Sequence, residues 1–187
     1  MTKLEVHPLT PDRWDDLLEL FGPSGAYSGC WCMWWRVTSK EFSAEAGRGL
    51  KKRFKKLVDD EKVPGLLGYL DGEPVGWVSL GPREQFGRLE RSPKLKRVDD
   101  KPVWSIVCFY IKKGYRDTGV ATDLLDAAIK YAKRRGAKYV EGYPIDASRG
   151  RKDNAAMFTG ALAMFDDAGF EEIERRGGRP IVRRRLR

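Results

Sequence analysis

The most regular pattern of apolar and polar positions lies between residues 103 and 145. It opens with an apolar, β-branched and aromatic run from Val103 to Ile111, which has the length and composition of a buried strand. After a Lys-Lys-Gly break, apolar residues recur from Val120 at spacings of three and four, which is typical of a helix with one buried face. Gly136 stands where a left-handed cap would end that helix, and a second apolar run, Tyr139 to Ile145, follows. The segment predicts a strand, a tight turn, a helix and a strand.

The residues before this segment carry weaker patterns. Leu4 to Pro8 alternates and predicts a first strand, and Thr10-Pro11 resembles a helix start with a threonine cap and proline in the first turn. Glu41 to Asp60 predicts one helix with a basic outer face. Pro64 to Leu70 and Glu73 to Leu80 are apolar runs joined by Asp-Gly, which predicts a hairpin.

Pro82 to Lys101 is polar and lacks periodicity, so we expect a loop that forms a flap beside a cleft. Asn154 to Ala168 predicts a helix, and Phe170 to Glu174 and Pro180 to Leu186 predict two closing strands. Strands and helices in this order predict an α/β protein whose mixed sheet is covered by helices. The crossover from Val103 to Ile145 makes its two strands parallel.

Length and composition narrow the class of protein. At 187 residues we expect a single domain spanning residues 1–187, and 34% charged residues indicate a highly charged surface. No apolar run approaches the roughly 20 residues that a membrane span needs. The first residues lack the apolar core of a signal peptide. We therefore expect a cytoplasmic protein with no membrane partner.

The net charge of +9 raises the question of a nucleic-acid partner. Part of the excess is an arginine-rich tail, and no nucleic-acid-binding motif is present. Attraction of an anionic cofactor accounts for the charge about as well, so nucleic acid is the less favoured alternative. The three cysteines, Cys30, Cys32 and Cys108, are too few for a disulfide framework or a four-ligand zinc site, and we predict no metal. Cys108 is interpreted as a small buried apolar residue.

The turn before the central helix has the features of an anion site. The first helical amides lack partners inside the helix and point toward the incoming loop. Gly119 lets a ligand approach the backbone, and Arg116 adds a forked cation suited to phosphate oxygens. A plain strand-to-helix turn with a surface arginine would show the same local pattern, so the chemistry alone leaves both interpretations open.

Two motifs make a resemblance specific. Arg116-x-x-Gly119-x-Ala121, after a strand and before Leu124-Leu125, resembles the coenzyme A signature of the GNAT superfamily of N-acetyltransferases. Met164 to Phe170 resembles that family's second landmark, a helix that ends in Gly-Phe before the next strand. The resemblance covers most of the chain and implies a mostly antiparallel mixed sheet with a parallel β-α-β cofactor unit.

The resemblance also implies a cofactor and a reaction. Acetyl-CoA would place its pyrophosphate against Arg116, Asp117, Thr118, Gly119, Val120, Ala121 and Thr122. Its pantetheine would pair with the backbone at Phe109, Tyr110 and Ile111. An amine would attack the thioester directly, and a backbone N–H near Tyr110 would stabilise the oxyanion.

The acid and the base are harder to assign. Phe165 stands where many relatives have a tyrosine that protonates the departing thiolate. We expect Tyr143 or Tyr110 to replace it, or the thiolate to leave to solvent. For the base that accepts the proton of the amine, Glu141 is the first candidate, followed by Asp146 and Glu90.

Three of the six tryptophans fall within residues 31–35. They either fill the core beneath a loop or line an acceptor pocket, because aromatic walls suit flat or cationic ligands. In GNAT proteins this region commonly forms one wall of the acceptor site, so Trp34 and Trp35 are predicted to contact the acceptor.

The sequence therefore predicts an acetyl-CoA-dependent N-acetyltransferase that acts on an amine of a small molecule, as a monomer or homodimer. Two alternatives remain. One is a GNAT-fold module that binds CoA without turnover, consistent with Phe165. The other is acetylation of a protein or peptide amine.

Overall fold

The structure is a computed structural model that describes residues 3–150 and 156–187. Its helices are α1 (Trp14–Phe21), α2 (Ser39–Glu45), α3 (Arg48–Asp59), α4 (Gly87–Arg91), α5 (Val120–Arg134) and α6 (Leu162–Asp167). Its strands are β1 (Glu5–Pro8), β2 (Gly65–Leu70), β3 (Glu73–Pro82), β4 (Trp104–Ile111), β5 (Tyr139–Gly142), β6 (Glu171–Arg176) and β7 (Arg179–Arg185). In the described residues, no helix is long and apolar enough to span a membrane.

The strands form one sheet in the order β1-β2-β3-β4-β5-β7-β6. Strands β4 and β5 are parallel, and the other neighbouring pairs are antiparallel. The parallel pairing runs from Trp104 opposite Val140 to Ile106 opposite Gly142, whereas β4 continues to Ile111. Residues 107–111 therefore have no partner on β5, and this edge of β4 is left open for other contacts. The predicted α/β class and the parallel crossover are confirmed.

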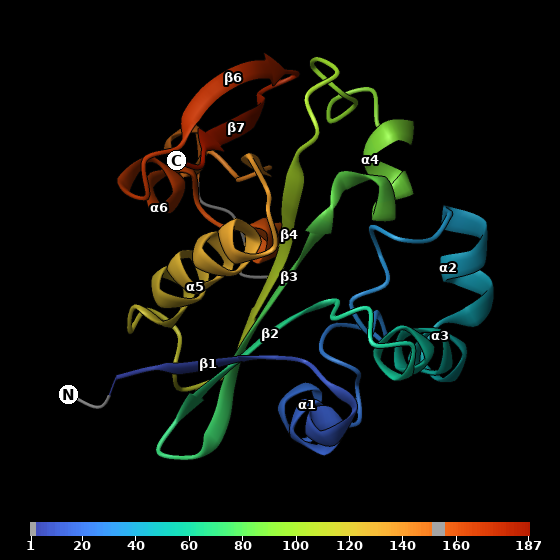
Figure 1. Cartoon of the computed structure of the whole chain (residues 1–187). Helices are drawn as coiled ribbons and strands as arrows, with labels where there is room; N and C mark the ends of the chain where they lie inside the picture. Colours follow the sequence, from blue (N-terminus) through green and yellow to red (C-terminus); the bar gives the residue numbers. More distant parts are fainter. Residues whose placement is uncertain (1–2, 151–155) are drawn as a thin grey trace.

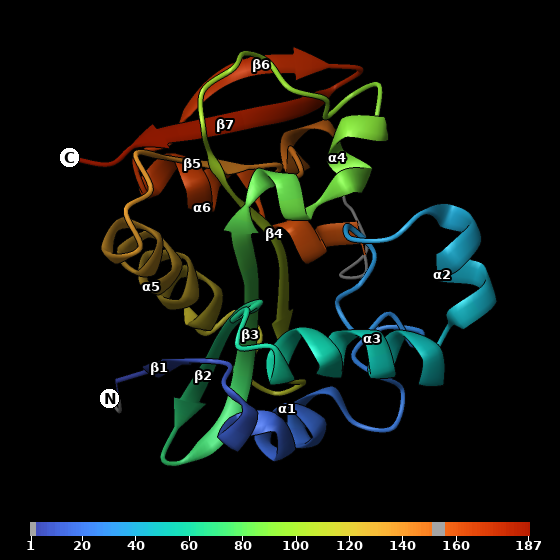
Figure 2. The ribbon, with the colours of Figure 1, turned by 45° about the vertical axis from the view of Figure 1, so that its right-hand side comes forward.

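Helices cover both faces of the sheet. Helix α5 lies on one face, and α1 and α3 lie on the other, as the two views in Figures 1 and 2 show. Neighbouring strand residues point to opposite faces, so Leu66 and Val78 pack in the cluster that contains α5, whereas Leu67 and Trp77 pack with α1 and α3. A third cluster joins the segment around α4 to β4 and β7.

Two glycines bring α5 close to the sheet. A Cβ built on Gly68 of β2 would lie 3.1 Å from a methyl carbon of Leu124, and one on Gly76 of β3 would lie 2.8 Å from Leu124 and 3.0 Å from Val120. Real Cβ contacts are essentially never shorter than 3.0 Å, so any larger residue at position 76 would force Leu124 of α5 to shift. These glycines help to set the distance between the sheet and the first turn of α5.

Several predicted elements are confirmed. The chain forms β1 and the β2–β3 hairpin, with Asp71 and Gly72 at φ angles of 50° and 80° in the turn. Helix α5 ends as predicted, because Gly136 has a φ of 84° and the Ala137 N–H donates back to the carbonyl of Ala132.

Two predicted helices are wrong in extent. The expected helix from Glu41 to Asp60 is two helices, because the chain turns at Gly47, which has a φ of 76°. The expected helix from Asn154 to Ala168 is interrupted at Gly160, with a φ of 89°, and α6 begins only at Leu162. Residues 154 and 155 lie outside the described residues. The expected strand from Tyr139 to Ile145 ends at Gly142, and Ile145 instead bridges Ala161.

The stretch from Pro82 to Lys101 is not a polar loop throughout. It contains a short 3-10 helix at Arg83–Gln85 and helix α4, and it buries Phe86, Leu89 and Leu95 in the third cluster. Sequence periodicity missed it because only a few spaced residues face inward.

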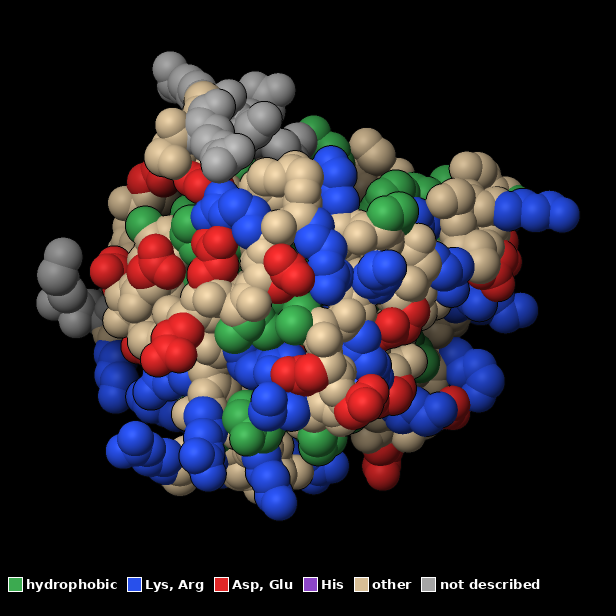
Figure 3. Space-filling model, turned by 90° about the horizontal axis from the view of Figure 1, so that it is seen from above, with side chains coloured by type: hydrophobic (Ala, Val, Ile, Leu, Met, Phe, Trp, Pro, Cys, Tyr) green, Lys and Arg blue, Asp and Glu red, His purple; other side chains and the backbone are tan. Residues whose placement is uncertain are grey.

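Charged side chains are spread over the surface. Figure 3 views the molecule from above, the end at which Figure 1 shows β6, β7 and α4, and on this face Lys and Arg are interspersed with Asp and Glu. Many of the arginines of β6 and β7 are paired, among them Arg175 with Asp146 and Arg183 with Asp99. This mixed surface favours ion-pair networks over one uniform basic patch.

Candidate functional site

The turn between β4 and α5 is built by its backbone conformation. Asp117 and Gly119 have φ angles of 59° and 90°, and Gly119 caps α5. A Cβ at Gly119 would meet nothing within 4 Å, so space is open beside the first helical turn. Arg116 is exposed, and its Nε donates to the carbonyl of Ile111 at 3.3 Å. The first-turn amides, the dipole of α5 and a cation therefore meet at one place.

This turn forms part of the wall of a large cavity of about 1000 Å³. Residues of β4, the turn, the segment 26–35 and the chain before α6 line it. Its walls are mostly aromatic and sulfur-containing side chains, including Phe21, Trp77 and Met164. A cavity with an anion-binding turn and apolar walls fits a long ligand with a charged part and a less polar part.

The structure brings most of the predicted cofactor residues to this cavity. Those that line it are Phe109, Tyr110, Ile111, Arg116, Asp117, Gly119, Ala121 and Thr122. Thr118 and Val120 do not. Thr118 donates from its hydroxyl to the carbonyl of Tyr115 at 2.5 Å, and the Val120 side chain is buried in the core.

The tryptophan cluster divides between the two interpretations. Trp31 is buried and stacks near Trp14 at a centroid distance of 6.4 Å, so it belongs to the core. Trp34 and Trp35 line the cavity, where they were predicted to contact the acceptor. The segment 26–32 that precedes these two tryptophans holds four non-glycine residues at positive φ, which is a strained backbone of the kind found at functional sites.

Sequence reasoning missed that the cysteines face the cavity. Cys30, Cys32 and Cys108 all line it. The Trp77 Nε1–H donates to Cys32 Sγ at 3.2 Å. A hydrogen bond from Cys108, together with that from Trp77, lowers the pKa of Cys32 against the effect of burial, and the pKa of Cys108 is raised. Cys108 lies two residues before Tyr110 on one strand, so strand alternation could have placed both side chains on one face.

Glu141 and Tyr143, the predicted base and acid, lie elsewhere. Glu141 accepts from Arg183 at 2.6 and 2.9 Å and from the hydroxyl of Tyr143 at 3.0 Å. Arg83 donates to Tyr143 at 2.7 Å and lies 3.5 Å from Glu141. Glu141 is 3% exposed and Tyr143 is fully buried, and neither belongs to the cavity lining. Burial and Glu141 raise the pKa of Tyr143, so this tyrosine holds its proton tightly. Their catalytic roles stay predictions, and this geometry weighs against them.

The two reserve bases are also engaged in ion pairs. Asp146 binds Arg175 at 2.7 Å, and its bonds with Ser148 and Arg175 hold its pKa at about 2. Glu90 binds Arg83 at 2.6 Å. Neither residue lines the cavity.

The parallel pair of this α/β sheet ends early, and the amino-terminus of α5 lies beside the open end of β4, which is an arrangement suited to an anionic ligand. The chain belongs to the acetyltransferase (GNAT) family, whose model matches residues 31–146. This confirms the resemblance found in the sequence. An uncharacterized N-acetyltransferase of Methanocaldococcus jannaschii is 24% identical over 169 residues, which is 90% of this chain. The chain spans 61% of the length of that relative.

Solved structures share the fold. The PaiA N-acetyltransferase from Thermoplasma acidophilum, solved in complex with coenzyme A, matches with a TM-score of 0.55 and 14% identity, covering 98% of this chain and 99% of the other. A ribosomal-protein-alanine N-acetyltransferase from Brucella melitensis matches with a TM-score of 0.56 and 18% identity, covering 97% and 99% of the two chains. At these identities the likeness concerns the fold.

Proposed function

We propose that the protein is an acetyl-CoA-dependent N-acetyltransferase that acts on an amine of a small molecule. The observation that carries this proposal is that one cavity runs from the anion-binding turn of α5 to the wall formed by Trp34 and Trp35. Family membership and the coenzyme A complex of the PaiA relative support acetyl-CoA as the cofactor.

In this proposal the chain's own groups bind and orient the cofactor. The amides of the first turn of α5 and the Arg116 guanidinium hold the pyrophosphate. The β4 backbone at residues 109–111, which has no partner on β5, binds the pantetheine. The N–H of Tyr110 is the donor proposed for the oxyanion. Acetyl-CoA supplies the activated acetyl group, and the amine attacks it without a covalent enzyme intermediate.

The mostly aromatic wall favours a small acceptor over a long peptide. Trp35 is buried and Trp34 is 37% exposed, so the acceptor end is partly closed. Acetylation of a protein amine remains the second candidate, because the Brucella relative is a ribosomal-protein-alanine acetyltransferase. One sheet that takes strands from Glu5 to Arg185 supports treating the chain as one domain. A cytoplasmic location and a monomeric or homodimeric state stay predictions.

The test is a thermal-shift titration with acetyl-CoA. The test variant carries Arg116→Ala with Gly119→Glu, and the control carries Arg134→Ala with Gly136→Glu. The control makes the same changes at the other end of α5, at a glycine that also has positive φ and open space beside it. At a hundredfold excess over Kd, wild type and control should gain about 2.7 kcal/mol, or roughly 5–10 °C.

The test variant should fold and show no shift. A shift of equal size in the test variant and the control would contradict the assignment of the turn, and no shift in any protein at millimolar acetyl-CoA would contradict the cofactor. Acetylated amine detected by mass spectrometry then separates an enzyme from a binding module.

A further inference from the structure

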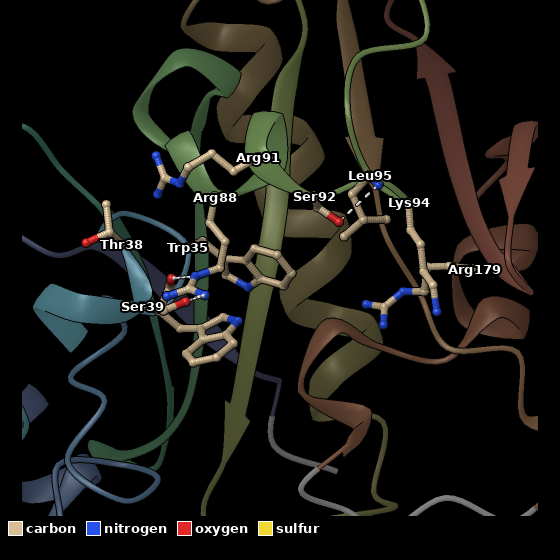
Figure 4. A pocket seen from close by; sticks show the side chains of 10 residues that line it. Trp35, Thr38, Ser39, Arg88, Arg91, Ser92, Lys94, Leu95 and Arg179 are labelled. Carbon is tan, nitrogen blue, oxygen red and sulfur yellow. Dashed lines mark hydrogen bonds between the residues drawn. The ribbon is translucent and has the colours of Figure 1, made fainter. Parts of the chain in front are cut away.

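A second pocket, of about 480 Å³, adjoins the cavity. Figure 4 shows it between the segment of Trp35 and Ser39 on one side and β7 on the other, with residues of α4 and the following loop across it. The residues that line it are Trp34, Trp35, Thr38, Ser39, Arg88, Arg91, Ser92, Lys94, Leu95 and Arg179. Trp34 and Trp35 line both spaces, so the pocket continues the acceptor end of the cavity.

The lining carries four basic side chains, Arg88, Arg91, Lys94 and Arg179, and none of the described lining residues is acidic. Arg91 and Lys94 are exposed at the rim. In Figure 4, Arg88 and Arg179 approach the hollow from opposite sides, and Arg179 directs its guanidinium toward it. This arrangement is a concentration of positive charge around a space the size of a small ligand group.

Buried donors in this pocket lack partners. Arg88 donates from Nε to the carbonyl of Trp34 at 2.5 Å and from Nη1 to Ser39 Oγ at 3.0 Å, but its Nη2 is buried and unbonded within the described structure. Arg179 donates from Nη2 to the Tyr143 carbonyl at 2.8 Å, whereas its Nε is buried with no partner among the described groups. The indole Nε1 of Trp35 is likewise buried and has no hydrogen-bond partner among the described groups. Buried donors without acceptors are rare in folded proteins, and a water or an ion commonly accepts from them.

Other arginines of the protein do have carboxylate partners, so the unpartnered donors of Arg88 and Arg179 are not typical of this fold. Arg83 and Arg183 have almost fully buried side chains, and each binds carboxylates, Glu90 and Asp99 among them. Arg179 has no ion pair with any described residue, and burial lowers its pKa. Burial lowers the pKa of Arg88, and repulsion from Arg91 adds to this effect. A partly buried cation without a counter-charge loses part of its hydration, and a bound anion offsets that cost.

We propose that this pocket binds an anionic group, a carboxylate or phosphate, of the acceptor, so that the substrate is a small amine that carries a negative charge. The inference rests on the proposed acetyltransferase function. None of residues 116–122, at the turn between β4 and α5, lines this pocket. The proposed cofactor site and the anion pocket are therefore distinct. The anion accepts from Arg88, Arg179 and Trp35, and the amine end extends past the two tryptophans into the cavity.

Anion binding is tested first without turnover. The probe is the Trp35 indole N–H resonance, assigned with Trp35→Phe, during titration with inorganic phosphate or acetate, with and without acetyl-CoA. In the wild type this resonance should shift and saturate. Arg88→Gln with Arg179→Gln should weaken binding about tenfold to a hundredfold, because two charge-assisted donors are lost.

The control, Arg134→Gln with Arg135→Gln, removes two exposed charges from the end of α5 and should bind like the wild type. Arg179→Lys, which keeps the charge, should retain part of the response if the glutamine variant folds poorly. The inference is overturned if the Trp35 resonance does not shift with either anion, or if it shifts equally in the two double variants.

Turnover then identifies the source of the anion. An amino acid is compared with its amide, and an amino alcohol phosphate with the parent amino alcohol. The charged member of one pair should have a KM about tenfold to a hundredfold lower in the wild type, and this preference should vanish in Arg88→Gln with Arg179→Gln but persist in Arg134→Gln with Arg135→Gln.

The outcomes separate the two proposals. If neutral and charged amines are acetylated equally well, the anion pocket is overturned and the acetyltransferase function stands. If Trp35 responds to anions through Arg88 and Arg179 but no amine is acetylated, the proposed function fails and the pocket stands. Acetylation confined to peptides overturns the assignment of a small acceptor.

Discussion

The change Glu141→Gln distinguishes a structural carboxylate from a catalytic base. Glu141 is 3% exposed and binds Arg183 at 2.6 Å, and glutamine keeps its size while removing its charge. Breaking a buried ion pair costs about 3–5 kcal/mol. Here each arginine keeps another carboxylate, since Asp99 binds Arg183 at 2.7 Å and Glu90 binds Arg83 at 2.6 Å. We therefore expect a smaller loss, about 2–3 kcal/mol.

For a chain of this size, that loss corresponds to a fall in Tm of about 4–12 °C. The assay is thermal unfolding at pH 7, with Glu171→Gln as the control, because Glu171 is an exposed carboxylate on β6 and should change stability by less than about 0.5 kcal/mol. Adding Asp99→Asn to Glu141→Gln removes both carboxylates bound to Arg183, so the double change should cost more than the sum of the two.

Activity of the folded variant completes the test. A residue that only holds arginines in place should leave kcat within about threefold of the wild type, whereas loss of a general base lowers the rate about 10²–10⁴-fold. The reasoning is refuted if Glu141→Gln unfolds at the wild-type temperature and its kcat falls by a hundredfold or more.

Three further changes test other parts of the structure. Gly142→Ala should destabilise by about 1–3 kcal/mol in urea unfolding, because the new Cβ would lie 2.2 Å from the buried ring of Phe165, and adding Phe165→Leu should recover part of the loss. Iodoacetamide should label Cys32 before Cys108 near neutral pH, because the hydrogen bond from Cys108 lowers the pKa of Cys32; equal labelling rates, read by peptide mass spectrometry, would contradict this. The backbone N–H at the start of α2 and other capping bonds lower the pKa of Glu41 to about 2, so its stabilisation is present above its unfolded pKa and lost as pH falls from about 4.3 toward 2. The Tm difference between wild type and Glu41→Gln should therefore close over that range, and a constant gap would show that the charge is not involved.

The sequence predicted those parts of the fold whose signals are local. The hairpin follows from Asp71-Gly72 between two apolar runs, and α5 with its glycine cap follows from spacing and Gly136. The turn at Arg116 and Gly119 can be predicted as a cofactor site from sequence because its residues are consecutive, and the structure places most of them at one cavity.

The rest depended on contacts between distant segments. A basic run with apolar spacing continues across Gly47 without a visible break, so one helix was predicted where two form. The pairing of Glu141 with Arg183, which lies 42 residues away, leaves no local pattern in the sequence, so Glu141 stands there only as a candidate base. The basic pocket brings together Arg88 of α4 and Arg179 of β7. These residues are far apart in the sequence, so no local pattern predicts their proximity.

The two glycines beneath α5 have a consequence for how the protein tolerates change. Gly68 and Gly76 belong to β2 and β3 and do not line the cavity, yet their lack of side chains leaves the space into which Leu124 and Val120 pack. Helix α5 is a rigid rod of 15 residues, so lifting its first turn at Val120 by a methyl group moves the amides at that end as well. The position of the first-turn amides of α5 therefore depends partly on glycines in the sheet beneath the helix. Engineering of that site is constrained by two glycines that do not line the cavity.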